Sequence, residues 1–462
     1  MSDLVVRGVC LPDGAHADLG VRGGYFVDPS DLVNPDVLDA DGLIALPGLV
    51  DLHTHLRQPG NEAAETIASG TAAAARGGYT AVFAMANTDP VCDSAEAVRR
   101  LRALVGGDKE SLGDSCRHSA RSRRIHLTDV DNNQWFYAKS ADPSTPSQSA
   151  EVLPVGAITV GLEGSQVADM EGMHAAGVTY FSDDGKCVMN ASIMREALIR
   201  ARALSAVVAQ HSQDSHLAGG FACLPSPRAC LDAHSPGPED WPTVAESVIV
   251  ARDVQLAIDT GAHLHVCHVS TAESVEIIAW AKARGVRVTA EVTGHHLLLG
   301  SALLDTRDTT YKVNPPLRDA ENVEAVRAGL ASGIIDAVAT DHAPHTPADK
   351  AKDFPLAKPG MLGLETVLGV VIEVMVSTGR LDWASVADRM SHTPARIGGV
   401  AERHGRPLRV GEPANFVLLD PTRRTVIDRD TSSSRSRNNP YHGLDLPDPV
   451  VGTWWNGRRT FG

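Results

Sequence analysis

The chain takes on a regular pattern at LVDLHTHL (residues 49–56), an apolar strand-like run that ends in polar side chains. From there to residue 398, apolar runs alternate with helical stretches such as NASIMREALIRARAL and AESVEIIAWAKAR. This alternation predicts βα units around a parallel sheet. The eight predicted strands cover residues 49–56, 79–86, 151–160, 178–184, 206–212, 262–270, 286–296 and 334–344. Eight units over about 330 residues predict an α/β fold of the TIM-type (β/α)8 barrel class.

The two ends of the chain show a different pattern, with short strands and turns. Residues 1–48 carry three short strand patterns, and strand patterns return at 412–420 and 450–461. Neither end alone offers enough apolar surface to fold independently. We therefore expect one small composite β domain, built from residues 1–48 and 399–462, beside a metallohydrolase barrel of residues 49–398.

Two surface segments stand apart from the barrel pattern. Residues 106–150 are rich in Ser, Arg and Asp and follow a predicted helix, so we expect a flexible insert on the N-terminal face, away from the chemistry. A partner-binding element is the alternative interpretation of this insert. Loop 346–360 follows the eighth strand on the opposite face, and its Lys, Ala and Gly content suits a mobile lid.

The composition is ordinary for a globular protein, with 43% hydrophobic and 21% charged residues. The net charge of −15 repels phosphate backbones and anionic lipids, which argues against nucleic-acid and membrane partners. No apolar run approaches the roughly 18 residues that span a bilayer, and no secretory signal is visible. The seven cysteines contain no CxxC pair and suggest no disulfide framework. The sequence therefore predicts a reduced, cytoplasmic protein.

Metal-ligating side chains recur where the predicted strands end. His53 and His55 lie two residues apart on a strand and therefore point to the same face. This pattern alone is weak, but four other strands end in Asp183-Asp184, His211, His268 and Asp341-His342. Because barrel enzymes build their sites at the C-terminal strand ends, we expect a metal centre rather than a set of separate core histidines. Mixed imidazole and carboxylate ligands suit zinc before manganese, iron or cobalt. Alternation points Cys267 to the opposite side, as a packed hydrophobe.

Eight stretches of the chain occur in an order that is typical of one enzyme family. They read LPGLVDLHTHLRQPG (46–60), MANTDP (85–90), FSDDGKCV (181–188), AQHSQD (209–214), HVCHVST (265–271), KVNPPLR (312–318), ATDHAPH (339–345) and EPANFVLLD (412–420). The chain resembles the single-function bacterial dihydroorotases of the amidohydrolase superfamily, over almost its whole length apart from residues 106–150. The resemblance implies a zinc-dependent cyclic amidohydrolase that interconverts N-carbamoyl-L-aspartate and L-dihydroorotate in de novo pyrimidine (UMP) biosynthesis.

The resemblance also implies a pair of zinc ions and their ligands. These ligands are His53, His55, Asp184, His211, His268 and Asp341. One ion is held by His53, His55 and Asp341, the other by His211 and His268, and Asp184 bridges the two. Many members of the superfamily bridge with a carboxylated lysine, but Lys139 is the only lysine between Glu110 and Gly185 and lies in the insert. Asp341 is implied as the catalytic group that carries a proton to the leaving nitrogen.

Other residues are implied in substrate binding. Arg57 directly follows the two histidines in HTHLR, and its planar guanidinium can grip a carboxylate through two hydrogen bonds. In the family pattern, the remaining substrate-binding residues are Asn87 and His345, for the carboxylate, and Asn314, Pro359 and Gly360, for the ring amide. His342, next to Asp341, is expected to be structural.

Three functions stay open on the sequence alone. The first is an active dizinc dihydroorotase. The second is a related cyclic amidohydrolase, such as a dihydropyrimidinase or an allantoinase, against which Arg57 and the acidic bridge argue. The third is an inactive homologue that serves as an assembly partner of an aspartate transcarbamoylase, against which the six intact ligand positions argue. A homodimer, and an association with an aspartate transcarbamoylase, are left open as well.

Overall fold

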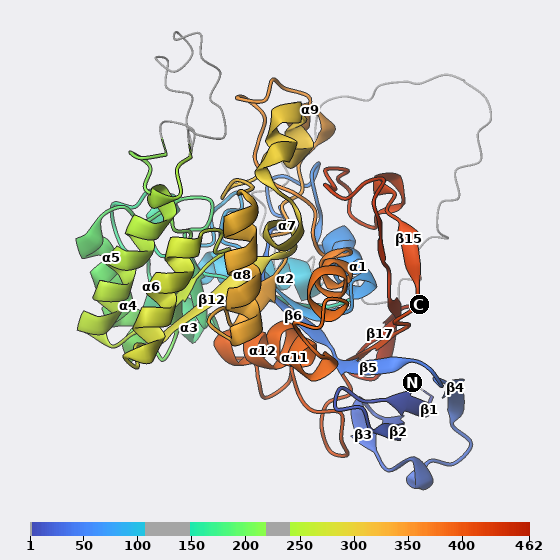
Figure 1. The fold of residues 1–462 in the computed structure, drawn as a ribbon. Coiled ribbons are helices and arrows are strands. Elements are labelled where there is room, and N and C mark those ends of the chain that lie inside the picture. The colour runs from blue at the N-terminus through green and yellow to red at the C-terminus, as the bar shows by residue number, and fades with distance from the viewer. Residues whose placement is uncertain (1, 107–147, 219–240) are drawn as a thin grey trace, which may run out of the picture.

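The computed structural model describes residues 2–106, 148–218 and 241–462 (Figure 1). The predicted insert, residues 106–150, therefore lies almost wholly outside the described residues, and the predictions made for it stay predictions. Within the described ranges, no helix is both long enough and apolar enough to cross a membrane.

Eight parallel strands form the centre of the molecule. In chain order they are β6 (Leu49–Thr54), β7 (Tyr79–Ala84), β8 (Glu151–Pro154), β9 (Tyr180–Ser182), β10 (Val207–Gln210), β11 (His263–Val266), β12 (Val288–Thr293) and β13 (Ala337–Ala339). β6 to β8 form one sheet and β9 to β13 a second. Single parallel bridges join the two sheets at both junctions, between Gly156 and Phe181 and between Thr54 and His342. The α/β class is confirmed, and each predicted strand contains one of these eight.

The strands are shorter than their predicted ranges because the chain turns away to build loops at their ends. In the range 151–160, the strand itself ends at Pro154, and Val160–Leu162 forms a 3₁₀ turn. The range 286–296 ends at Thr293, whose side chain accepts a hydrogen bond from the backbone N–H of His296. Thr293 thereby caps the short helix α7 (Gly294–Leu298), so the last residues of this range are helical and not extended.

Helices cover the outer side of the parallel strands (Figure 1). The longer ones are α1 (Ile67–Arg76), α2 (Ala95–Gly106), α3 (Met170–Ala175), α4 (Ala191–Ala203), α5 (Val244–Thr260), α6 (Ala272–Ala283) and α8 (Ala320–Ser332). Shorter ones are α9 (Pro347–Lys350), α10 (Val367–Val371), α11 (Trp383–Ala387) and α12 (Thr393–Ile397), with π-helical turns at Ile372–Val376 and Asp388–His392. Every residue of β6 and β7 is buried, as expected for parallel strands that are covered on both faces.

A separate, mostly antiparallel sheet takes its strands from both ends of the chain, which lie on the same side of the molecule (Figure 1). Its strands are β1 (Leu4–Cys10), β2 (His16–Arg22), β3 (Tyr25–Val27), β4 (Asp36–Asp39), β5 (Ile44–Pro47), β14 (Phe416–Leu419), β17 (Val450–Trp455) and β18 (Arg458–Phe461). β5 pairs with β14 in antiparallel register, with Leu46 opposite Val417, which joins the two ends. A separate hairpin-like pair is formed by β15 (Arg424–Val426) and β16 (Asp445–Pro447). The domain boundaries at residues 48 and 399 stay a prediction.

Glu151 joins the start of β8 to the loop that follows α12. Its Oε2 lies 2.6 Å from His404 Nε2, and its Oε1 lies 2.9 Å from Arg403 Nη2. Burial raises the pKa of Glu151, but the hydrogen bonds and charges of His404 and Arg403 outweigh it and lower this pKa to about 2. Because the folded pKa lies below that of the unfolded chain, the interaction stabilises the fold above pH 4.5 and is lost as the pH falls towards 2.

We expect Glu151→Gln to lower the free energy of unfolding at pH 7 by about 1–2 kcal/mol. This is less than the full pKa shift corresponds to, since the Glu151 side chain is 26% exposed. Urea unfolding of the variant and the parent protein at several pH values checks this. The difference between them should shrink below pH 4.5. A difference that does not change with pH would contradict the assignment.

Candidate metal centre

Six side chains gather at the carboxyl ends of the parallel strands, each with at most 5% of its surface exposed. His53 lies on β6 and His55 directly after it, while His211 directly follows β10. Asp184, His268 and Asp341 each lie two residues beyond their strands, β9, β11 and β13. Since the carboxyl ends of neighbouring parallel strands lie at one edge, these residues meet although they are far apart in the sequence. The structure thus brings together all six predicted ligand positions.

Asp184 lies at the centre of this group. Its Oδ1 lies 3.2 Å from His53 Nε2, 3.4 Å from His211 Nδ1 and 3.3 Å from His268 Nε2. Its Oδ2 lies 3.3 Å from His55 Nε2. Two ligand atoms at roughly 2.0–2.1 Å from a tetrahedral zinc ion lie about 3.3 Å apart, so these spacings suit side chains that share metal ions.

The ligand atoms fall into two groups that could each hold a metal ion. His53, His55 and Asp184 form one group, Asp184, His211 and His268 form the other, and within each group the ligand atoms lie within 4.8 Å of one another. Asp341 lies beside the first group, with Oδ1 3.2 Å from His55 Nε2 and 3.6 Å from His53 Nε2. Because Asp184 belongs to both groups, its two oxygens are placed to connect two ions.

The pKa values in this cluster show how strongly the site favours positive charge. Burial raises the pKa of Asp184, yet the charge of His53 and hydrogen bonds from His211 and His268 hold it well below its ordinary range. Burial likewise lowers the pKa of His53, yet Asp184 raises it well above the usual value. The carboxylate is therefore ionised, and its surroundings attract cations.

Two acceptors set the orientation of the paired histidines. Glu291 Oε1 lies 2.7 Å from His53 Nδ1, and Asn87 Oδ1 lies 3.0 Å from His55 Nδ1. An acceptor at Nδ1 keeps the ring proton there and leaves the Nε2 lone pair directed towards Asp184. Among the described residues, the buried Nε2 of His53 has no hydrogen-bond partner, as suits a metal-binding nitrogen. Sequence analysis did not single out Glu291, although an acid within the apolar range 286–296 was a signal.

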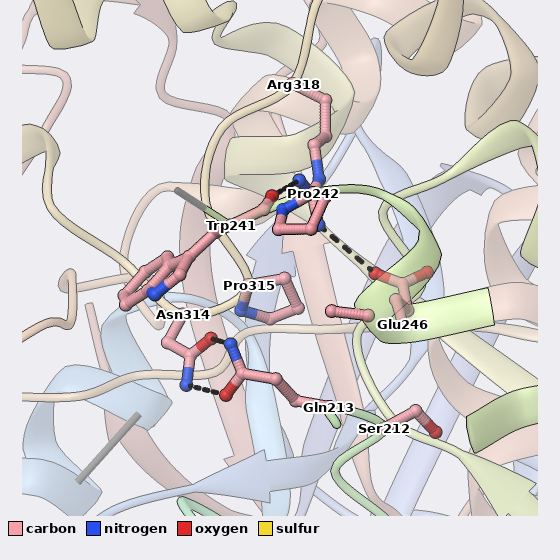
Figure 2. Close-up of a pocket in the computed structure, with 9 residues that line it drawn as sticks. Ser212, Gln213, Trp241, Pro242, Glu246, Asn314, Pro315 and Arg318 are labelled. Atoms are coloured by element: carbon pink, nitrogen blue, oxygen red, sulfur yellow. Dashed lines mark hydrogen bonds and ion pairs between the residues drawn. The ribbon is translucent and has the colours of Figure 1, made fainter. Parts of the chain in front are cut away.

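Asn314 lies beside His211 and not in an open space. Its Nδ2 is 3.1 Å from His211 Nε2, and its amide pairs with that of Gln213 through hydrogen bonds of 2.9 and 3.0 Å (Figure 2). Gln213, two residues after His211 in AQHSQD, was also missed by sequence analysis. The pair borders a cavity of about 10 Å³ near Trp241 and Arg318, which has room for about one water molecule.

The predicted substrate-binding residues Arg57, His345, Pro359 and Gly360 lie together beyond β6 and β13. Arg57 Nε donates to the carbonyl of Pro344 at 3.1 Å, and no hydrogen bond within the described ranges engages its terminal nitrogens. Burial lowers the pKa of Arg57 to about 10, so it is charged at neutral pH. His345 Nε2 contacts the Pro359 carbonyl at 2.7 Å. Gly360 has a φ of 145°, and a Cβ there would lie 2.7 Å from His345 Nε2, so only glycine fits.

The loop over residues 346–360 is tied to the neighbouring segment by two lysines. Lys350 Nζ donates to the carbonyls of Thr309 at 2.8 Å and Lys358 at 2.9 Å, and Lys312 Nζ donates to the carbonyl of Phe354 at 2.8 Å. These bonds hold the loop at the carboxyl edge of the strands. That it closes over the site as a lid stays a prediction.

Asn438 connects the C-terminal region to this edge. Its Nδ2 donates to the carbonyls of Ala343 at 2.9 Å and Gly360 at 3.0 Å, and its Oδ1 accepts from the backbone N–H of His345 at 3.2 Å. One amide side chain therefore joins the segment that carries His345 to the segment that carries Gly360. No pattern in the sequence indicated this contact.

Two neighbours of the cluster, Asp183 and Cys267, have roles outside it. Asp183 accepts hydrogen bonds from the backbone N–H groups of Ile158 at 2.7 Å and Thr159 at 3.0 Å, and so anchors the loop after β8. The orientation predicted for Cys267 is wrong, because its thiol groups with His53 and Glu291 within 4.8 Å. β11 ends at Val266, so strand alternation no longer applies at Cys267. Burial raises the pKa of Cys267 to about 12, which keeps it a neutral packed group.

Comparison with known proteins agrees with this arrangement. The model of the amidohydrolase family matches residues 44–460, and the chain belongs to that family. Dihydroorotases from Streptomyces coelicolor and Leifsonia xyli subsp. xyli are 47% and 45% identical to it, over 100% of this chain and 98% and 97% of theirs. The dihydroorotase of Mycobacterium tuberculosis is 44% identical, over 99% of this chain and 98% of its own. Within the family, the chain belongs with the dihydroorotases.

Solved structures show the same fold at greater distance. The dihydropyrimidinase from Brevibacillus agri NCHU1002 superimposes with a TM-score of 0.80, at 22% identity, over 99% of this chain and 94% of that one. The L-hydantoinase from Arthrobacter aurescens gives a TM-score of 0.81, at 23% identity, over 99% and 96% of the two chains. At these identities the similarity concerns the fold alone.

Asp184 is the only carboxylate common to both groups, so its charge should be needed for metal binding at each. We expect Asp184→Asn to lose metal from both groups, while Asp183→Asn, a neighbouring buried carboxylate outside them, should keep it. Elemental analysis of the folded proteins after dialysis against a fixed low zinc concentration checks this. An Asp184 variant that retained the parent's metal content would contradict the bridging position.

Proposed function

We propose that this chain is a zinc-dependent dihydroorotase, which interconverts N-carbamoyl-L-aspartate and L-dihydroorotate in de novo pyrimidine biosynthesis. The observation that carries this proposal is the position of Asp184, within 3.4 Å of four imidazole nitrogens, in a chain whose relatives are dihydroorotases. The scaffold in this proposal is a closed (β/α)8 barrel of residues 49–398 with a β domain of residues 1–48 and 399–462. Single bridges at both junctions of the parallel sheets support the closure.

The residues of the cluster suit a pair of zinc ions. His53, His55 and Asp341 would hold one, His211 and His268 the other, and Asp184 would lie between them. When bound, zinc lowers the pKa of water so that hydroxide forms near neutral pH, and it stabilises negative charge on an amide oxygen. The ligand spacings, and the buried Nε2 of His53, which forms no hydrogen bond within the described part of the chain, support this assignment.

Asp341 is assigned the proton transfers. Its Oδ1 faces His55, and we assign the proton transfer to the other oxygen, Oδ2. Burial raises the pKa of Asp341, but its hydrogen bond to His55 and the charges of His53 and His55 hold this pKa below its ordinary range. The carboxylate is therefore ionised and can accept a proton from the attacking water, then pass it to the ring nitrogen as the amide bond breaks. In the direction of ring closure, the Asp341 carboxylate takes the proton from the attacking nitrogen and gives it to the oxygen that leaves as water.

Arg57 is assigned the recognition of the substrate carboxylate. Its charged guanidinium keeps two terminal nitrogens without a hydrogen-bond partner in the described part of the chain, and two nitrogens are what a bidentate carboxylate contact requires. Asn87 and His345 complete this contact, and Asn314 with the backbone at Pro359 and Gly360 meets the ring amide. Asn87 and Asn314 also contact His55 and His211, so they would link substrate binding to the ligands.

The alternatives have less support. The dihydropyrimidinase and hydantoinase structures share the fold at no more than 23% identity, against 47% for a dihydroorotase. An inactive homologue that assembles with an aspartate transcarbamoylase would not need the six gathered ligands. The proposal places the enzyme in the cytoplasm, with a small-molecule substrate. A homodimer and an association with an aspartate transcarbamoylase stay predictions from the resemblance.

The reaction itself tests the proposal directly. Purified protein should hydrolyse dihydroorotate and, in the reverse direction, cyclise N-carbamoyl-aspartate. Treatment with a chelator should abolish both reactions, and added zinc should restore them. Dihydrouracil and hydantoin serve as control substrates without the carboxylate. Faster turnover of either control than of dihydroorotate would favour the alternative enzymes.

Replacement of Arg57 should affect substrates unequally. A lost bidentate contact in a partly dry site costs on the order of 2–5 kcal/mol. We therefore expect Arg57→Met to lower kcat/KM for dihydroorotate by roughly 30- to 5000-fold, while the low rate with dihydrouracil hardly changes.

Arg57→Lys keeps the charge but not the planar fork, and we expect an intermediate loss for dihydroorotate. The metal content of all variants should equal that of the parent protein. An equal fall for both substrates would mean that Arg57 supports the loop through Pro344 and does not bind the carboxylate.

A further inference from the structure

Glu291 is a fully buried carboxylate on β12, between two imidazoles. Its Oε1 lies 2.7 Å from His53 Nδ1 and its Oε2 lies 3.1 Å from His265 Nε2. Neither the metal ligands nor the substrate-binding residues include Glu291 or His265. An ionised carboxylate is expensive to bury in a core unless positive charge or donors compensate it, so packing alone does not explain Glu291.

The contacts continue from Glu291 along β11 and β12, away from the six predicted metal ligands. His265 Nδ1 lies 2.9 Å from Thr289 Oγ1, and the same hydroxyl lies 2.9 Å from His263 Nε2. His263 is the first residue of β11 and is partly exposed. A row of side chains thus runs from His53, at the carboxyl end of the strands, to His263, at their amino end.

With neutral imidazoles and an ionised Glu291, one assignment of protons satisfies every contact in this row. A carboxylate only accepts, so His53 Nδ1 and His265 Nε2 must both donate to it. A neutral His265 then accepts at Nδ1 from the Thr289 hydroxyl, and the Thr289 oxygen accepts from His263 Nε2. In this assignment, a neutral His53 keeps its lone pair on Nε2, the nitrogen that lies 3.2 Å from Asp184.

We propose that Glu291 is a positioning residue for the metal centre, which fixes the proton of His53 on Nδ1 and directs Nε2 towards the metal. His265 and Thr289 hold the carboxylate in place and keep it ionised. The negative charge on Glu291 also makes the His53 imidazole a stronger donor. This inference rests on the metal centre of the proposed function and adds to it a requirement for three residues that bind neither metal nor substrate.

Zinc affinity of the folded protein tests the inference. Glu291→Gln has nearly the same volume, and its amide can still meet both imidazoles if His265 moves its proton, so the fold should persist while the charge is lost. We expect the variant to bind zinc about 10- to 100-fold more weakly in competition with a chromogenic chelator. Its unfolding midpoint without zinc reports separately on stability.

Glu65→Gln is the matched control. Glu65 is also fully buried and contacts an imidazole, with His342 Nε2 at 3.2 Å. His342, however, is not one of the predicted metal ligands. This variant should bind zinc as the parent protein does. Parental zinc affinity in Glu291→Gln, or an equal loss in both variants, would overturn the inference. A role in stability alone would lower the unfolding midpoint and leave the affinity unchanged.

Failure of the inference can be distinguished from failure of the proposed function. If the parent protein binds no zinc and does not hydrolyse dihydroorotate, the proposed function is wrong. If the parent protein binds zinc and Glu291→Gln binds it equally well, the metal centre stands and Glu291 has no part in positioning His53.

Discussion

The proposed chemistry depends on one arrangement, in which the two oxygens of Asp184 lie within 3.4 Å of nitrogens on four histidines. These histidines come from β6, β10 and β11, and Asp184 itself follows β9. No local segment can bring them together. The parallel strands must stand in their observed order, with both sheets joined at Gly156 and Thr54, before the ligand atoms can share one space. The long-range pairing that builds the core is therefore also the condition for the chemistry.

The positions of the ligands could be predicted from the sequence, since each follows an apolar run that reads as a strand. The residues that orient them could not. Glu291 is one acid in an apolar strand until folding brings it 2.7 Å from His53, 238 positions away. No pattern in the sequence marks Asn438 either, yet its Nδ2 donates a hydrogen bond to the carbonyl of Ala343, 95 positions away. Cys267 was misplaced because alternation holds only inside a strand, and β11 ends one residue earlier. Signals local in the sequence predict the elements, and tertiary contacts decide the rest.

The C-terminal region contributes to the site without a ligand of its own. Ser434 and the backbone N–H of Arg435 donate to Glu65, which also contacts His342, next to Asp341. Asn438 joins the loops after β13 to one another. β14, β17 and β18 share a sheet with β5, and β15 and β16 pair with each other. The C-terminal region thereby restrains loops that carry predicted substrate-binding residues.

The balance of buried charge would couple metal binding to folding in this chain. Asp184, Asp341 and Glu291 are buried carboxylates, and such groups require positive charge or several donors nearby. Protonated imidazoles can supply that charge, as the raised pKa values of His53 and His55 indicate. A metal ion supplies it as well, but only after the imidazoles lose their protons, so protons and metal compete for the same nitrogens. Under the proposal made above, Glu291 keeps one proton of His53 on Nδ1, which faces away from Asp184, so that only a proton on Nε2 competes with the metal. The electrostatics that hold the acids in the core are thus the same electrostatics that prepare the site for its cation.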